Sequence, residues 1–146
     1  TAAVVEAVGG ERVGLRLSPG NPFNDIAEES TEETYAAVVA GIRPLDLAYV
    51  HVVEGPPAVT AAIREGFGGA LVVNAAFSLP TEVEALEQLL RDRRAELVAV
   101  GRAFIANPDL VRRLQLGAPL NPADESSFYG GTDAGYVDYP ALADAA

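Results

Sequence analysis

Residues 47–53, Leu47-Ala48-Tyr49-Val50-His51-Val52-Val53, form a short run of mostly apolar and β-branched side chains. A helical pattern follows at 57–67, which opens with a proline and is followed by Gly68-Gly69. The run does not alternate cleanly between apolar and polar residues, which is typical of a parallel strand buried on both faces. Such a strand followed directly by a helix predicts a β-α unit of an α/β fold.

The same unit repeats on both sides of this stretch. Alternating strands and helices predict a parallel sheet with right-handed crossovers, either a small doubly wound sheet or half of an eight-stranded (β/α)8 barrel. Periodicity does not separate the two. From Gly117 onward the chain is rich in Pro, Gly, Asp and Ser, which predicts a loop and tail. The predicted strands are 12–18, 47–53, 69–74 and 97–101, and the predicted helices are 2–7, 30–42, 57–67, 80–94 and 107–116.

Three of the predicted helices carry signals at their starts. Ser30 with Glu33, and Thr81 with Glu84, have the spacing of a capping box. Asn107-Pro108 is typical of an N-cap residue followed by proline at the first helical position.

The composition excludes several classes of protein. The chain has 146 residues with 10 basic and 21 acidic side chains, a formal charge of −11, and all its basic residues are arginine. This charge argues against binding to nucleic acid or an anionic membrane. Cys is absent, which excludes disulfides, thiolate metal sites and cysteine nucleophiles.

Three further features of the sequence concern its origin. The chain starts at Thr1 and contains no Met, which predicts that it begins downstream of a start codon or has been cut. We see neither a membrane-spanning run nor a secretory signal, and we therefore expect a cytoplasmic protein. The alanine-rich composition without lysine indicates a GC-rich bacterial source.

Two polar side chains interrupt the apolar strands. Arg16 lies in the middle of its strand and needs a partner, because an unpaired buried charge is very costly. The partner could be a carboxylate on a neighbouring strand, such as Glu54, but an anionic or electron-rich ligand is favoured because barrel strands point side chains to the centre. His51, the one histidine, could act as an acid or base, yet a hydrogen-bonded core residue is the simpler hypothesis.

The ends of the third and fourth predicted strands carry small residues. Asn74-Ala75-Ala76 and Gly101-Arg102 resemble the βα loops that bind phosphate in (β/α)8 barrels, although tight turns alone would give the same pattern. Nucleotide loops of the G-x-G-x-x-G or G-x-x-x-x-G-K-[ST] type are absent. The acidic residues at 25–33 could suggest a metal site, but a solvated helix N-terminus explains them more simply, so we assign no metal.

Several segments, in this order, resemble the C-terminal half of the old yellow enzyme family of FMN-dependent ene-reductases (NADH:flavin oxidoreductase/NADH oxidase family). The most specific is Gly101-Arg102-Ala103-Phe104-Ile105-Ala106-Asn107-Pro108-Asp109-Leu110. The other matching segments are 13–19, 23–25, 47–54, 117–122, 128–131 and 135–140.

The resemblance implies half of a (β/α)8 TIM barrel. Residues 1–116 would supply strands five to eight with their helices, and 117–146 the C-terminal loop and tail of the same domain. It also implies a contact from an arginine to the flavin's pyrimidine edge, a phosphate site, and a tyrosine in the substrate pocket. The matching residues are Arg16 for the flavin edge, Ala75, Ala76, Gly101 and Arg102 for the phosphate, and Tyr129 for the pocket.

The implied activity is hydride transfer from NAD(P)H through FMN to an activated alkene. The family's substrate-binding pair and its tyrosine proton donor lie upstream of the matching segment, so we assign no catalytic residue here. Catalysis would therefore need a separate N-terminal half barrel.

Two alternatives remain open. The alanines at 75 and 76, where the family usually has glycine, favour a stand-alone protein without redox chemistry. Two copies could then close a homodimeric barrel that acts as a binding protein, a cyclase or an isomerase. The chain could also be an inactive piece whose exposed strand edges favour aggregation.

Overall fold

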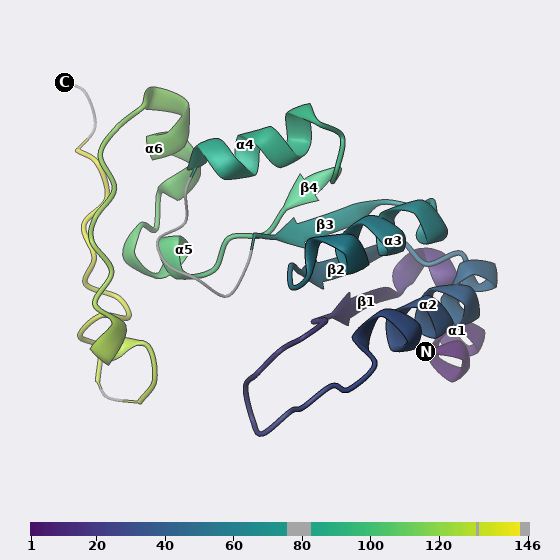
Figure 1. Cartoon of the computed structure of the whole chain (residues 1–146). Helices are drawn as coiled ribbons and strands as arrows, with labels where there is room; N and C mark the ends of the chain where they lie inside the picture. Colours follow the sequence, from purple (N-terminus) through teal and green to yellow (C-terminus); the bar gives the residue numbers. More distant parts are fainter. Residues whose placement is uncertain (76–82, 131, 144–146) are drawn as a thin grey trace. The chain divides into compact units, whose positions relative to one another are not determined.

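The computed structural model describes residues 1–75, 83–130 and 132–143 (Figure 1). It divides into two compact units, Thr1–Ala99 and Val100–Ala146. The predicted phosphate ligand Ala76 and the capping residue Thr81 lie outside the described residues. The predicted division of one domain at Gly117 stays a prediction.

A four-stranded parallel sheet forms the centre of the first unit. Strands β1 (Gly14–Leu17), β2 (Tyr49–Val53), β3 (Leu71–Asn74) and β4 (Leu97–Val98) lie in the order β1-β2-β3-β4. Each crossover therefore steps to the next strand in the same direction, which places the crossover helices on one face. A doubly wound sheet reverses its strand order at a switch point, whereas a (β/α)8 barrel does not. The sequential order therefore favours the barrel architecture.

The helices of this unit agree closely with the sequence patterns. They are α1 (Ala2–Val8), α2 (Thr31–Ile42), α3 (Pro57–Phe67) and α4 (Val83–Arg91), with short 3-10 turns at Gly10–Arg12 and Arg43–Leu45. The predicted continuation of α4 to residue 94 is wrong, because Arg93 takes a left-handed conformation with φ of 55°.

The capping box predicted for α2 does not form. Ser30 stands at the N-cap position, but its side chain makes no hydrogen bond to the first turn. Its ψ of 57° lies outside the extended conformation that a capping serine usually takes. The pattern therefore predicted the start of the helix correctly and its capping contact wrongly.

The two faces of the sheet differ in exposure. Alternate side chains point to opposite faces, and the strands are paired so that Val50 and Leu71 share one face. That face is buried, with Val73 at 0% exposed, whereas Leu97 on the other face is 54% exposed. Arg16 lies on this second face beside His51, its partner in the register. The core of the first unit is therefore on the helix-covered side.

Glu96 joins the starts of two strands to a helix. Its carboxylate accepts hydrogen bonds from the Leu71 amide at 2.7 Å and from both terminal nitrogens of Arg64 at 2.7 and 2.5 Å. Burial works to raise the pKa of Glu96, but the Leu71 amide and the Arg64 guanidinium hold it below its ordinary value. The carboxylate thus stays ionised and fixes α3 against β3 and β4.

The second unit contains the short helices α5 (Arg102–Ala106) and α6 (Leu110–Leu116) and a 3-10 turn at Glu125–Ser127. The helix predicted to begin at Asn107-Pro108 begins instead at Leu110. Asn107 does not cap this helix, because its side chain is bonded elsewhere. Its Nδ2 donates to the Ala103 carbonyl, and its Oδ1 accepts from the backbone N–H of Asn121.

Glu96→Gln should lower the free energy of unfolding by about 1 kcal/mol, because it removes the charge from a bidentate, partly buried pair. Urea denaturation measures this. Glu87→Gln, in an exposed pair with Arg91, serves as the matched control and should leave stability unchanged. Equal effects of the two substitutions would contradict the assigned role of Glu96.

Candidate functional site

Arg16 projects from β1 on the exposed face of the sheet. Glu54, the carboxylate considered as an alternative partner for Arg16, contacts Arg94 at 2.6 Å instead. Within the described part of the chain, no hydrogen bond or ion pair joins Arg16 to another residue. A cation in the middle of a strand with no protein partner is available to a ligand.

His51 lies beside Arg16 and is half-buried. Its Nε2 is buried and has no hydrogen-bond partner among the described residues, so the hypothesis of a fully hydrogen-bonded core histidine is wrong. Burial, and secondly the positive charge of Arg16, hold the pKa of His51 below its ordinary value. The imidazole is therefore neutral at physiological pH and does not add a second charge beside Arg16.

The end of β3 is fixed by a side-chain hydrogen bond. The Asn74 amide nitrogen donates to the Ala99 carbonyl at 2.7 Å, which holds the ends of β3 and β4 together. Ala75 follows directly, and its backbone amide donates to no residue that the structure describes. The predicted phosphate ligand Ala75 thus has an available donor.

The Gly101-Arg102 segment lies in the second unit. Gly101 is the N-cap of α5 and Arg102 is its first residue. Apart from chain neighbours, no atom of the described residues lies within 4 Å of a Cβ built on Gly101. The backbone at this position is open to approach.

Tyr129 also belongs to the second unit and is 93% exposed. Of the candidate residues, the structure brings Arg16 and His51 together in the first unit, as register partners on β1 and β2. Ala75 is described in the first unit, and Gly101, Arg102 and Tyr129 in the second. The shared phosphate site and the substrate-pocket role of Tyr129 stay predictions.

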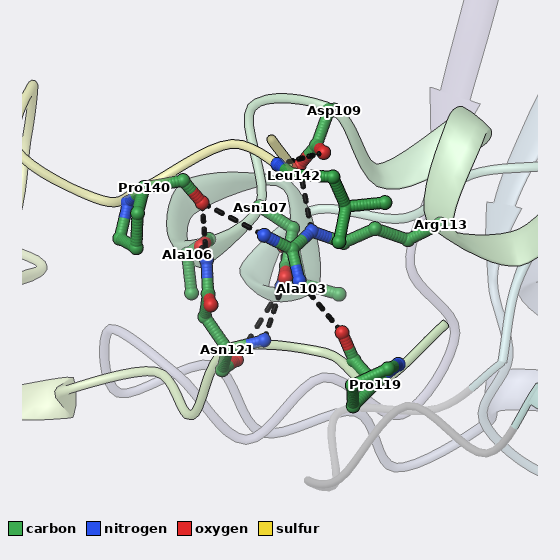
Figure 2. A network of polar contacts seen from close by, with 9 residues as sticks. All are labelled: Ala103, Ala106, Asn107, Asp109, Arg113, Pro119, Asn121, Pro140 and Leu142. Atoms are coloured by element: carbon green, nitrogen blue, oxygen red, sulfur yellow. Dashed lines mark hydrogen bonds and ion pairs between the residues drawn. The ribbon is translucent and has the colours of Figure 1, made fainter. Parts of the chain in front are cut away.

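Sequence reasoning missed a network of buried polar residues in the second unit (Figure 2). Arg113 is its centre, with Asp109 one turn earlier in the chain and the asparagines 107 and 121 beside it. The Asp-to-Arg spacing of four residues was the available signal, but its other partners are backbone carbonyls in loops. No side-chain pattern in the sequence marks such acceptors.

A groove of about 370 Å3 lies between α2 and α3, lined by buried residues such as Tyr35, Val39 and Ile63. It contains neither Arg16 nor His51, so it is separate from the candidate site. Within the described ranges, no three His, Cys, Asp or Glu side chains are placed to hold a metal ion. The helices in those ranges are all too short or too polar to cross a membrane.

A profile of the NADH:flavin oxidoreductase / NADH oxidase family matches residues 1–121. The chain belongs to this family. A protein of Leishmania infantum described as a probable flavin mononucleotide-dependent alkene reductase is 38% identical over 143 residues, covering 94% of this chain. The match spans only 38% of that protein's length.

Solved structures of the same family agree with the fold. The old yellow enzyme from Trypanosoma cruzi matches with a TM-score of 0.87 and 36% identity, over 98% of this chain and 38% of that one. Morphinone reductase in complex with tetrahydroNAD matches with a TM-score of 0.85 and 37% identity, over 97% of this chain and 39% of that one. The chain therefore has the α/β fold of a part of these TIM barrels.

FMN is the cofactor of the old yellow enzyme family, and the donors of this chain fit it. Arg16 offers a guanidinium that pairs with no residue in the described ranges, and such a group can bind an electron-rich ring edge. Ala75 and Gly101, each in its own unit, offer backbone amides of the kind that bind phosphate.

The pKa of His51 should lie below about 6.5, its usual value. It should rise in Arg16→Gln, because the substitution removes the positive charge that is one of the two causes of the lowered pKa. Since the folded-state pKa is the lower one, the free energy of unfolding should fall as pH drops from about 6.5 toward it. NMR titration of the single imidazole measures the pKa. Arg12→Gln is the control, and a wild-type pKa above 6.5 would contradict the assignment.

Proposed function

We propose that this chain is the FMN-binding part of an old-yellow-enzyme-type oxidoreductase and supplies barrel strands five to eight. The complete protein would transfer hydride from NAD(P)H through FMN to an activated alkene, in the bacterial cytoplasm. The observation that carries the proposal is Arg16, which has no hydrogen bond or ion pair with any residue that the structure describes and lies on the exposed face of a sheet whose order favours a barrel.

Each candidate site residue would have a defined role in binding the cofactor or the substrate. Arg16 would donate hydrogen bonds to the pyrimidine edge of the flavin and stabilise negative charge there. The backbone at 75–76, together with Gly101 and Arg102, would hold the phosphate. Tyr129 would line the pocket for the substrate. Bound FMN supplies the hydride chemistry, and the chain itself supplies orientation and electrostatics.

The chain would not catalyse the reaction alone. The substrate-binding pair and proton donor expected for the family have no assigned counterpart in it, and it spans about two fifths of the relatives' length. We therefore propose that an N-terminal half barrel completes the site and covers the exposed face of the sheet.

The proposal is tested by completing the barrel. The chain is co-expressed with the N-terminal strands of morphinone reductase, and the purified complex is titrated with FMN. We expect a yellow complex that NADPH bleaches and an activated alkene reoxidises. A complex that assembles but stays colourless would overturn the proposal.

A non-redox half barrel is the second candidate, favoured by the methyl groups at 75 and 76. It predicts a homodimer of this chain that binds no flavin. Light scattering of the chain alone, with and without FMN, separates this candidate from the first.

In the completed barrel, Arg102→Ala should weaken FMN binding about tenfold, the loss of roughly one charge-assisted hydrogen bond. It should leave riboflavin binding unchanged, because riboflavin lacks the phosphate. Arg16→Gln should weaken both ligands equally, because it contacts the ring that they share. Fluorescence titration measures the dissociation constants of FMN and riboflavin for each variant. A loss of riboflavin affinity in Arg102→Ala would contradict the phosphate role.

A further inference from the structure

The segment from 122 to 139 in the second unit starts and ends on the same helices. The residues just before it, Pro119 and Asn121, and those just after it, Pro140 and Leu142, all hydrogen-bond to α5–α6 (Figure 2). We call this segment the tail loop. It resembles an Ω-loop, because its two ends meet where the Asn121 side chain donates to the Pro140 carbonyl at 2.8 Å.

Arg113 is the residue that joins the two ends. Its Nη1 donates to the Pro119 carbonyl at 2.6 Å and its Nη2 to the Pro140 carbonyl at 2.8 Å. Its Nε donates to Asp109 Oδ1 at 2.7 Å, and its side chain is only 5% exposed. The planar guanidinium thus contacts three acceptors in fixed directions, which a lysine ammonium on a flexible stem cannot reproduce.

Two neighbouring side chains complete the anchor. Asp109 Oδ2 accepts from the Leu142 amide at 2.8 Å, and that amide and Arg113 hold the pKa of Asp109 below its ordinary value. The side-chain Nδ2 of Asn121 donates to both the Ala106 and Pro140 carbonyls, each at 2.8 Å. The anchor is therefore a charged pair with its hydrogen bonds satisfied, as a buried pair requires.

The tail loop keeps its own shape above this anchor. The Tyr139 hydroxyl accepts from the Asp124 amide at 2.9 Å, which links the two arms of the loop. A Cβ on Gly135, whose φ is 75°, would lie 2.1 Å from Ser127 Oγ, so the arms also touch there. Despite these contacts, Tyr129 is exposed. The loop therefore holds an aromatic side chain out from a buried base.

We propose that Arg113 is a positioning residue for Tyr129. This rests on the proposed function, in which Tyr129 lines the substrate pocket. Holding both ends of the loop on one guanidinium reduces the conformational freedom of the residues between them. The entropy cost of this restriction is met on folding rather than on substrate binding. Arg113 touches neither cofactor nor substrate and acts through the position of the loop.

The first test uses the chain itself and needs no flavin. In Arg113→Lys, hydrogen exchange at the Asn121 and Leu142 amides should become at least tenfold faster, and the 15N order parameter of the Tyr129 amide should fall. Arg91→Lys, the same change in an exposed pair, is the control and should alter none of these. Exchange within twofold of wild type and an unchanged order parameter would overturn the proposal.

The second test uses the completed barrel. Arg113→Lys should raise KM for the alkene at least fivefold and leave the FMN dissociation constant within twofold. Combined with Tyr129→Ala, it should raise KM no further, because both changes remove the same contact. Additive effects on KM would overturn the proposal, since they would show that Arg113 acts independently of Tyr129.

Two further measures keep the tests decisive. If Arg113→Lys does not fold, Asp109→Asn replaces it, because it keeps an acceptor for Arg113 Nε and breaks the bond to the Leu142 amide. The same exchange and order-parameter changes are expected, smaller in size, and their absence would again overturn the proposal. If the wild-type complex binds no FMN, the proposed function fails, and the first test still decides whether Arg113 fixes the loop.

Discussion

A parallel sheet with sequential strand order can place its crossover helices on only one face, and the features of the first unit depend on this constraint. The buried valines and leucines of β2 and β3 lie on that face and form the core. Arg16 and His51 lie on the opposite face, where no helix of the unit provides a partner. The geometry that builds the fold thus also leaves a cation available for a ligand.

The arginines show how the chain separates structural from available charge. Arg64 binds Glu96, Arg94 binds Glu54, and Arg113 binds Asp109, each within 2.7 Å. In a chain with a net charge of −11, carboxylates are plentiful, and a cation without one is set apart. Among the residues that the structure describes, none provides a carboxylate partner for Arg16, and the neutral His51 beside it adds no competing charge.

Much of the fold could be predicted from the sequence, because buried parallel strands and amphipathic helices have local patterns. The bounds of α3 and the existence of all four strands followed from them. Two features could not be predicted: Ser30 makes no capping hydrogen bond, and α6 begins at Leu110 rather than at Asn107. Backbone angles decided the first and tertiary contacts the second.

The candidate site was predictable only in part. A charge within an apolar strand marks Arg16, and glycine before a helix marks Gly101. The partner of Glu54 is distant in sequence, and the acceptors of Arg113 are backbone carbonyls, which every residue has. Which of several candidates a side chain contacts depends on how the strands and loops are arranged.

The tail loop also has an evolutionary consequence. Because its two ends are fixed at Arg113, residues between 122 and 139 can be inserted, deleted or exchanged at little cost in loop-closure entropy and without moving the helices beneath. Selection for a new ligand could act on this segment while the barrel and the cofactor contacts stay constant. One buried arginine would thus let this segment diversify independently of the helices that hold it.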